Sequence, residues 1–177
     1  MSDENLILPS KGSIVDRHQR GTKKFKKSVK VLNTIIISLY RINFLPLFGI
    51  GKSISILTTI GRKTGKKRRR PILCRPFHTG ILTLYSARGK EADWLKNIFA
   101  NENCTAKIQK GFKKLEVKAT LIEDFEDKLE HLKYFCENFS DAKTIFGYDK
   151  KKHGDIFDTK EFKNLAQIID FVQLIPV

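Results

Sequence analysis

Residues 53–87 read SISILTTIGRKTGKKRRRPILCRPFHTGILTLYSA and decide the class of fold. Apolar and polar side chains alternate at the beginning of this stretch, which is typical of a half-buried strand. Gly61–Lys67 and Thr79-Gly80 are turn signals. The strands that these turns separate are predicted at residues 53–60, 69–78 and 81–87.

The rest of the chain adds strands and a few helices. Further strands are predicted at residues 104–109, 112–122 and 172–176, the last from the apolar end of the sequence. Helices are predicted at residues 92–100 and at 124–139, where Asp124 is a suitable N-cap. Residues 140–160 contain Gly147, Gly154 and many charges, so we expect a loop there. About six antiparallel strands with few helices indicate a mainly β (α+β) fold, a small barrel with flanking helices.

The N-terminal third is divided by its composition. Residues 1–22 are polar and contain Pro9, so we expect a flexible tail. Residues 23–50 are predicted to form a basic amphipathic helix (23–44) and a linker, and residues 51–177 form the barrel domain. The helix either packs on its own domain or lies on an anionic membrane.

The charge of the chain is concentrated in its first part. The chain has 34 Lys and Arg against 19 Asp and Glu, a net charge of +15. All of this excess lies within residues 1–75, because basic and acidic residues are equal in number in residues 76–177. Residues 1–75 therefore either bind an anionic partner or form a solvated basic arm.

Several function classes are disfavoured by the residues that the chain lacks. Its three cysteines and four histidines are widely spaced, so neither a disulfide framework nor a metal site is expected. The sequence shows no signal peptide, so we expect a cytoplasmic protein. If the basic helix binds lipid, the protein would be peripheral at the inner face of the cell membrane. No GxSxG or HExxH motif is present, so the reactive atoms of an enzyme would belong to a cofactor.

The turn between the first two predicted strands carries the strongest binding signal. Seven of the ten residues in GRKTGKKRRR (61–70) are basic. Gly61 and Gly65 allow a turn whose amide groups form an anion nest, and Arg62 and Arg68 can grip a phosphate or carboxylate with two hydrogen bonds. A bound anionic ligand, nucleic acid or lipid headgroups, and a solvated charge run all fit this turn. Nucleic acid is the less favoured partner because no aromatic-rich strand accompanies it.

Residues 56–97 resemble the deazaflavin-dependent nitroreductase family of oxidoreductases. Leu57–Gly65 (LTTIGRKTG), with Arg68 and Pro71-Ile72 after it, resembles the family's Leu-Thr-Thr-Thr, Gly-Arg-Lys-Thr/Ser-Gly, Arg and Pro-Leu pattern. Ser86–Gly89 and Trp94–Ile98 resemble its second block, a strand ending in Ser-Lys-Gly-Gly and then Trp-Tyr-x-Asn-Leu.

The resemblance implies a split β-barrel of the FMN-binding type that binds coenzyme F-420, a deazaflavin with a polyanionic tail. Residues implied to hold the tail or its phosphate are Arg62, Lys63, Thr64 and Arg68, with Gly65 in the same turn. Residues implied to surround the ring and ribityl chain are Pro71, Ile72, Ser86, Ala87, Arg88, Trp94 and Asn97. In this branch of the family the N-terminal helix is associated with membranes.

The predicted activity is hydride transfer from the reduced coenzyme to a small hydrophobic acceptor that is unsaturated, quinone-like or a nitro compound. Ser86 and Tyr148 are candidate proton donors. An oxidoreductase that uses FMN, and a non-enzymatic basic module on membrane lipid or nucleic acid, remain alternatives. Barrels of this kind often pair, so a homodimer is also expected.

Overall fold

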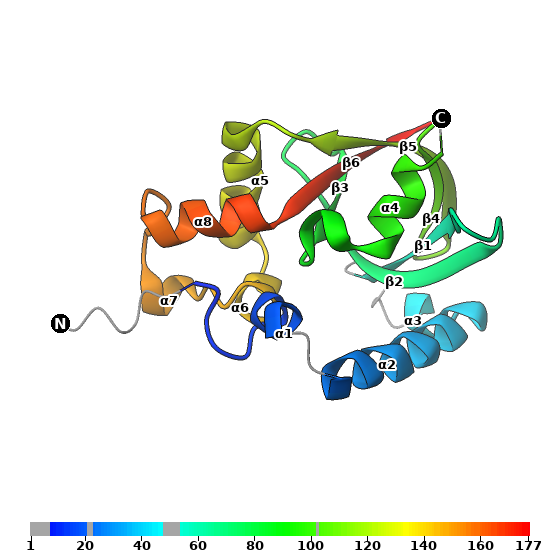
Figure 1. The fold of residues 1–177 in the computed structure, drawn as a ribbon, viewed down its shortest axis with the longest axis horizontal. Coiled ribbons are helices and arrows are strands. Elements are labelled where there is room, and N and C mark those ends of the chain that lie inside the picture. The colour runs from blue at the N-terminus through cyan, green and yellow to red at the C-terminus, as the bar shows by residue number, and fades with distance from the viewer. Residues whose placement is uncertain (1–7, 21–22, 48–53, 102) are drawn as a thin grey trace.

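The computed structural model describes residues 8–20, 23–47, 54–101 and 103–177, and its centre is a closed β-barrel. The strands are β1 (Ile54–Ile60), β2 (Lys67–Pro76), β3 (Leu82–Ser86), β4 (Thr105–Lys110), β5 (Lys113–Ile122) and β6 (Asp170–Pro176). They are joined in the order β1-β2-β3-β6-β5-β4, with β4 paired to β1, and every pairing is antiparallel. The predicted six-stranded barrel with flanking helices is confirmed (Figure 1).

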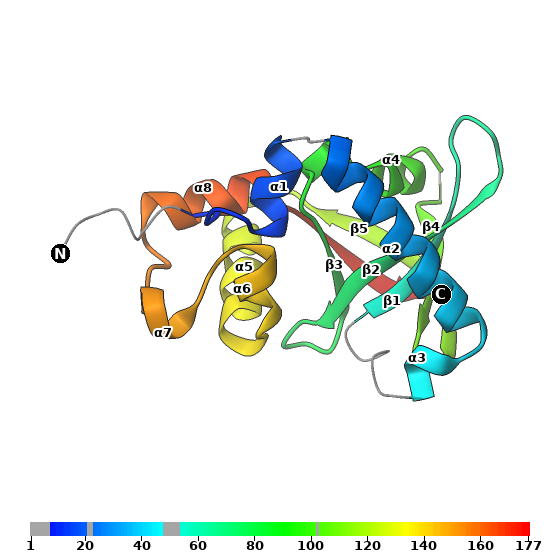
Figure 2. The same ribbon diagram turned by 90° about the horizontal axis from the view of Figure 1, so that it is seen from below.

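The helices lie mainly at one end and along one side of the barrel. They are α1 (Ile14–Arg20), α2 (Lys23–Arg41), α3 (Phe44–Leu47), the 3-10 turn η3 (Gly89–Glu91), α4 (Asp93–Phe99), α5 (Phe125–Asn138), α6 (Asp141–Ile145), α7 (Lys150–His153) and α8 (Lys160–Ile168). In both ribbon views α1, α5, α6, α7 and α8 gather beyond one end of the barrel, whereas α2 runs along its side (Figures 1 and 2).

The apolar residues form two main cores. The first is the barrel interior, where Leu57, Leu84 and Val117 are fully buried and Trp94, Leu95 and Ile98 of α4 pack against them. The second core lies among the C-terminal helices and the start of β6. Its largest buried side chains are Phe135, Phe146, Phe162 and Phe171.

Two segments differ from the sequence predictions because they help to build this second core. In the described part of the predicted tail, Leu8 and Val15 are buried against the C-terminal helices, and residues 14–20 are helical. Residues 140–160 contain α6 and α7, and the unpredicted α8 buries Phe162 and Leu165 behind a Thr159 N-cap. Apolar burial thus orders segments whose composition is typical of loops.

Helix α2 is amphipathic but is only lightly covered by the rest of the chain. Tyr40 and Leu45 pack on Ile56 of β1, whereas large apolar residues further out remain exposed. These exposed residues of α2, α3 and the link between them are Val31, Leu32, Ile35, Ile42, Phe44 and Leu47. Residues 48–50 of the predicted linker lie outside the described residues.

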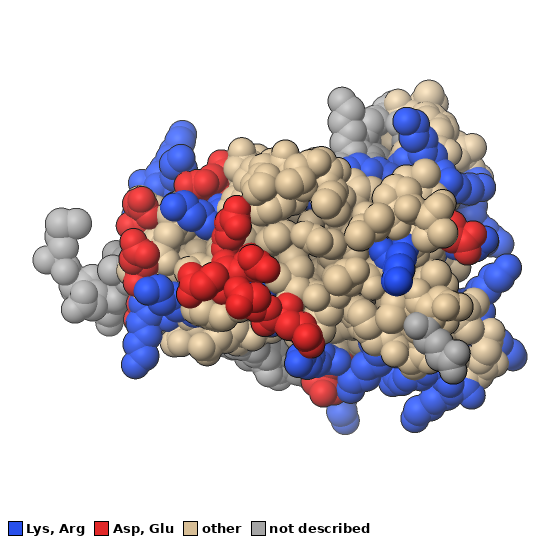
Figure 3. Space-filling view, turned by 90° about the horizontal axis from the view of Figure 1, so that it is seen from above, with Lys and Arg blue, Asp and Glu red and all other residues tan. Residues whose placement is uncertain are grey.

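Charge is separated in space as it is in the sequence. Asp and Glu side chains gather in one band on the face shown in Figure 3, and Lys and Arg side chains prevail at the barrel end. Within the described residues, no helix has the length and apolar character that crossing a membrane requires.

Candidate functional site

A hollow with a volume of about 440 Å³ lies between the β1–β2 turn and helix α4. Ten residues line it, namely Thr59, Gly61, Arg62, Lys63, Thr64, Arg68, Arg70, Asp93, Trp94 and Asn97. Four of them are Lys or Arg and one is an acid, so the hollow attracts anions. The structure therefore brings together six residues that the sequence singled out from two separate blocks.

The turn itself is held by its own backbone. The amides of Gly61, Thr64 and Gly65 donate hydrogen bonds to carbonyl groups of the turn, at 2.8–3.0 Å. A side chain at Gly61 would meet the Thr64 hydroxyl at 3.1 Å and the Lys66 carbonyl at 3.3 Å, so a Cβ here would force these neighbours to move by a few tenths of an ångström. The predicted anion nest is wrong for these three amides, because each already has an acceptor.

Helix α4 fastens the turn through Arg62. The backbone amide and the guanidinium of Arg62 both donate to the Asn97 side-chain oxygen, at 3.2 and 3.0 Å. The guanidinium also donates to the Asp93 carboxylate at 3.1 Å, and this hydrogen bond holds the pKa of Asp93 below its usual range. The backbone amide and both terminal guanidinium nitrogens of Arg62 thus donate within the protein, and Arg62 positions the turn.

Three other cations in the hollow make no ion pair with any residue that the structure describes. They are Lys63, Arg68 and Arg70. The Nε of Arg70 is buried and has no hydrogen-bond partner among the described residues. Burial, and after it the like charge of Arg88, lower the pKa of Arg70, yet a guanidinium keeps its proton at neutral pH. An unpaired cation with a buried donor is suited to an anionic ligand.

Strand alternation determines which basic residues reach the hollow. Arg68 and Arg70 of β2 line it, whereas Lys67 and Arg69 line a second groove on the outside of the barrel. Successive side chains in a strand point to opposite faces, so the run of basic residues is divided between two surfaces.

Three residues that the resemblance implied lie outside the hollow. Gly65 is at the exposed tip of the turn with a φ of +63°. Pro71 pairs with Ile56 on the outer face of the barrel, and Ile72 is buried in the barrel interior.

The segment from Ser86 to Arg88 also lies beside the hollow rather than among its lining residues. The Ser86 hydroxyl donates to the Gly89 carbonyl at 2.7 Å, and Ala87 packs against the helical core. A side chain at Gly89 (φ +53°) would meet the Ile168 carbonyl at 2.9 Å, so this loop is seated on the end of α8. Arg88 is exposed, and its charge acts on Arg70 and Asp93.

Tyr148 is in the wrong part of the molecule for a role at this hollow. It is buried in the helical core, and its hydroxyl donates to the Gly154 carbonyl at 2.9 Å. Its ring faces Phe157 and Phe162, so it serves the packing of α7 and α8.

Four lining residues were not among those singled out for the cofactor. They are Thr59, Gly61, Arg70 and Asp93. The alternation of β2 already indicated Arg70, because it points to the same side as Arg68. Asp93 precedes Trp94 at the start of α4, but no sequence signal indicated that it would reach Arg62.

The barrel and a cation-lined hollow closed by a tryptophan define the class, a β-barrel protein that binds an anionic coenzyme. The sequence profile of the F420H(2)-dependent quinone reductase family matches residues 46–145, more than half of the chain. The chain belongs to this family, and it is an oxidoreductase that uses coenzyme F-420. The resemblance to deazaflavin-dependent oxidoreductases is confirmed, and so is coenzyme F-420, to which FMN was the alternative.

Two solved structures are similar to this chain. The F420-H2 dependent reductase FDR-A is 23% identical, with a TM-score of 0.43, over 69% of this chain and 94% of that chain. The conserved hypothetical protein Rv2991 from Mycobacterium tuberculosis is 12% identical, with a TM-score of 0.50, over 72% of this chain and 75% of that chain. The likeness to Rv2991 concerns the fold alone. No curated protein matches the sequence.

The residues of the hollow fit this coenzyme. Its tail is acidic, and Lys63, Arg68 and Arg70 offer cations that no acidic side chain of the described chain neutralises. The buried Nε of Arg70 has no hydrogen-bond acceptor among the described residues, and an acidic group of the coenzyme tail would supply one. Trp94 provides a large buried aromatic surface next to these charges.

Proposed function

We propose that the protein transfers a hydride from reduced coenzyme F-420 to a quinone-like acceptor. The observation that carries this proposal is the hollow, in which unpaired cations stand beside Trp94 in a chain of this family. The coenzyme supplies the hydride when it is bound. The description of the family supports a quinone as the acceptor, ahead of a nitro compound.

The chain's own residues bind and orient. Lys63, Arg68 and Arg70 hold the acidic tail, and Trp94 forms a wall of the hollow. Arg62 keeps the turn against α4, so the cations are in place before the coenzyme arrives. The hydroxyls of Ser86 and Tyr148 both donate to backbone carbonyls, so we assign the proton of the reaction to solvent.

Binding is tested with oxidised coenzyme F-420 and with FMN in parallel. Trp94 is the only tryptophan of the chain and lines the hollow, so its fluorescence reports on occupation. Saturable quenching by the deazaflavin, with FMN at least about tenfold weaker, is expected because only the deazaflavin carries several acidic groups. Equal affinity for both would contradict the assignment of the tail to this hollow.

The acceptor is tested by following oxidation of the reduced coenzyme at a fixed concentration. A soluble naphthoquinone, a nitroaromatic compound and an enone are supplied in turn. The proposal requires the quinone to give the highest kcat/KM. Faster turnover of the nitro compound would leave the coenzyme assignment intact and replace the acceptor.

We also propose that α2 and α3 rest on an anionic membrane, where quinones dissolve. Leu47 is 73% exposed and Ile42 is 70% exposed, and four exposed lysines stand on the first half of α2. These lysines are Lys23, Lys24, Lys27 and Lys30. Exposed apolar side chains next to a basic helix are typical of a segment that lies in a lipid interface.

Sedimentation with anionic vesicles tests this membrane contact in the full chain. The substitutions Leu32→Ser, Ile35→Ser and Leu47→Ser together should abolish co-sedimentation, because each side chain is at least half exposed and free to insert. Phe112→Ser with Ile175→Ser is the matched control, since both residues are exposed elsewhere on the barrel. Equal loss in both variants would remove the helix from the contact.

A further inference from the structure

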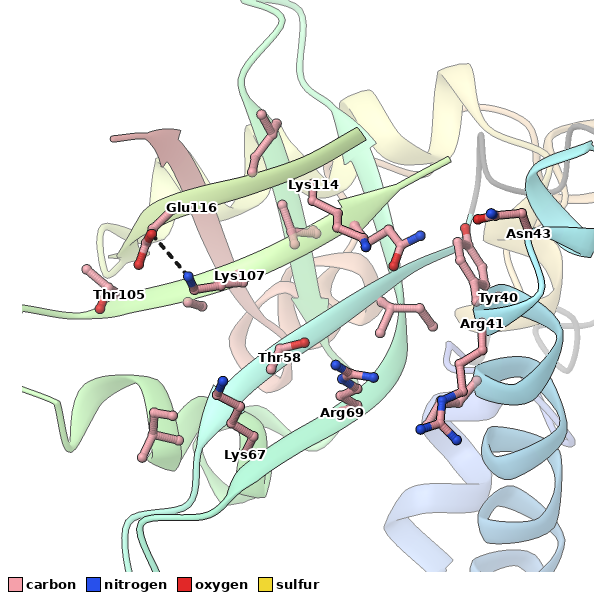
Figure 4. Close-up of a pocket in the computed structure, with 17 residues that line it drawn as sticks. Tyr40, Arg41, Asn43, Thr58, Lys67, Arg69, Thr105, Lys107, Lys114 and Glu116 are labelled. Carbon is pink, nitrogen blue, oxygen red and sulfur yellow. Dashed lines mark ion pairs between the residues drawn. The ribbon is translucent and has the colours of Figure 1, made fainter. Parts of the chain in front are cut away.

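A second groove lies on the opposite face of the β1–β2 hairpin and is the larger of the two. It has a volume of about 850 Å³ and separates α2 from the outer faces of β1, β2, β4 and β5 (Figure 4). The coenzyme hollow is lined by Thr59 of β1, and this groove is lined by its neighbour Thr58. Because adjacent strand residues face opposite ways, the sheet itself separates the two sites.

One wall of the groove is apolar. Ile37 and Tyr40 come from α2, and Ile56 and Ile60 come from β1. The Tyr40 hydroxyl donates to the Ile54 carbonyl, so its polar atom is already satisfied and its ring adds apolar surface to the wall. Covering this wall with an apolar chain removes apolar surface from water and stabilises the complex.

The other side of the groove is basic. Arg69 of β2 and Lys107 of β4 are the register partners of Thr58, one on each side of it. Lys114 of β5 is one strand further, and Lys67 and Arg41 complete the set (Figure 4).

Most of this charge is not neutralised by the protein. Glu116 is the single acid among the lining residues and pairs with Lys107 at 3.3 Å. Arg41, Lys67, Arg69 and Lys114 form no ion pair with a described residue. Like charges gathered in one groove repel each other, so an anion placed among them is favoured.

We infer that this groove binds one molecule of an anionic phospholipid. Its phosphate would lie over Thr58 between Arg69 and Lys107, and its acyl part along Ile56, Tyr40 and Ile37. A free phosphate would leave the apolar wall uncovered, and an uncharged lipid would leave the cations unpaired. The basic side and the apolar wall together therefore define an amphiphile with an acidic headgroup.

The test uses short-chain phosphatidylglycerol below its micelle concentration, titrated calorimetrically into the full chain. One site per chain is expected. Phosphatidylcholine of the same chain length and inorganic phosphate should each bind at least about tenfold more weakly, because each lacks one of the two complementary parts. Equal binding of phosphatidylcholine would show that only the apolar wall contributes to binding, and equal binding of phosphate would show that only the cations do. Either result would contradict the inference.

Two variants place the lipid in the groove. Arg69→Glu should weaken binding at least about tenfold, because it reverses a charge at the headgroup position. Lys151→Glu makes the same charge change on exposed α7, away from the groove, and should leave lipid binding unchanged. Thr58→Trp, which fills the groove floor, should abolish binding. Unaltered affinity in Arg69→Glu or in Thr58→Trp would overturn the inference. Coenzyme affinity measured on the same samples separates a failed lipid site from a failed coenzyme site.

Discussion

The two faces of the β1–β2 hairpin share one run of basic residues but are built differently. On the inner face, α4 seals the end of the barrel with buried Trp94, Leu95 and Ile98, and its Asp93 and Asn97 engage Arg62. On the outer face, α2 contacts the sheet mainly through Tyr40. The hollow is thus the smaller of the two sites, about 440 Å³ against about 850 Å³, and one of its cations, Arg70, has a buried Nε.

This difference determines what each face does with its charge. A charge–charge interaction strengthens as water is excluded, so a cation such as Arg70 acts more strongly on a ligand than one in open solvent. Arg70 is only half-buried, but its Nε is fully buried. Coenzyme affinity should therefore depend on β2 residues of the inner face and hardly at all on their outer neighbours.

The double substitution Arg68→Ala and Arg70→Ala gives the largest expected effect. Each lost hydrogen bond to a charged group costs about 1.5–3 kcal/mol, so the Kd for the coenzyme should rise about 100-fold or more. Lys67→Ala with Arg69→Ala removes the same charge from the same strand and should change the Kd by less than about threefold. Equal effects in a fluorescence titration would show that net charge, and not the face, governs binding.

Asn97→Leu tests how the turn is held. Its side-chain oxygen accepts from the amide and guanidinium of Arg62, and its nitrogen donates to the Thr59 hydroxyl at 3.4 Å. Losing these bonds should lower the free energy of unfolding by about 1–3 kcal/mol and weaken coenzyme binding about tenfold. Urea unfolding and the coenzyme titration measure these two effects, with Asn164→Leu, at an exposed position of α8, as the control. Normal coenzyme affinity with lowered stability would confine Asn97 to a structural role.

Asp93→Asn should act in the opposite direction. It removes the negative charge that faces the anion site while an amide oxygen can still accept from Arg62. The Kd should fall about threefold, a small effect because the carboxylate is largely exposed. Asp158→Asn, which makes the same change on a distant exposed loop, should have no effect. Weaker binding in Asp93→Asn would mean that its ion pair positions the turn.

The smallest expected effect is on stability as a function of pH. The pKa of Asp93 is lowered in the folded state, chiefly by the hydrogen bond from Arg62. Its stabilising contribution is therefore complete above the unfolded value, about 3.9, and is lost as the pH falls through the folded pKa. For an exposed pair it stays below about 1 kcal/mol. Denaturant midpoints of the wild type and Asp93→Asn should differ at pH 7 and approach each other as the pH falls below the unfolded value of about 3.9. A constant difference would assign the loss to packing.

The sequence predicted the barrel well because strand alternation and turn chemistry are local. All six strands were expected within two residues or so of their bounds, and the side of β2 on which Arg69 lies follows from alternation alone. The N-cap at Asp124 is confirmed by its hydrogen bonds to the amides of Glu126 and Asp127.

The features that the sequence did not predict depend on contacts between segments that are distant in the chain. Helix α8 has only nine residues, and its apolar positions have meaning only against α5 and the buried residues of 8–15. Arg62 looked like a ligand grip, but Asp93 and Asn97 of α4, about thirty residues away, use its donors. Tyr148 was chosen for its residue type, and only the packing around it shows that its hydroxyl is committed elsewhere.

The position of β6 between β3 and β5 has a consequence for how the barrel is made. Strand β6 begins at Asp170, whereas its partner β3 ends at Ser86, so β3 leaves the ribosome long before its neighbour exists. At about 5–20 residues per second the interval is roughly 4 to 17 s. During this time β3 has an open edge that can pair with another chain, and β5 has one as soon as its last residue, Ile122, has been added. The nascent sheet thus stays unclosed until β6 is made, and chaperones have that interval in which to bind it.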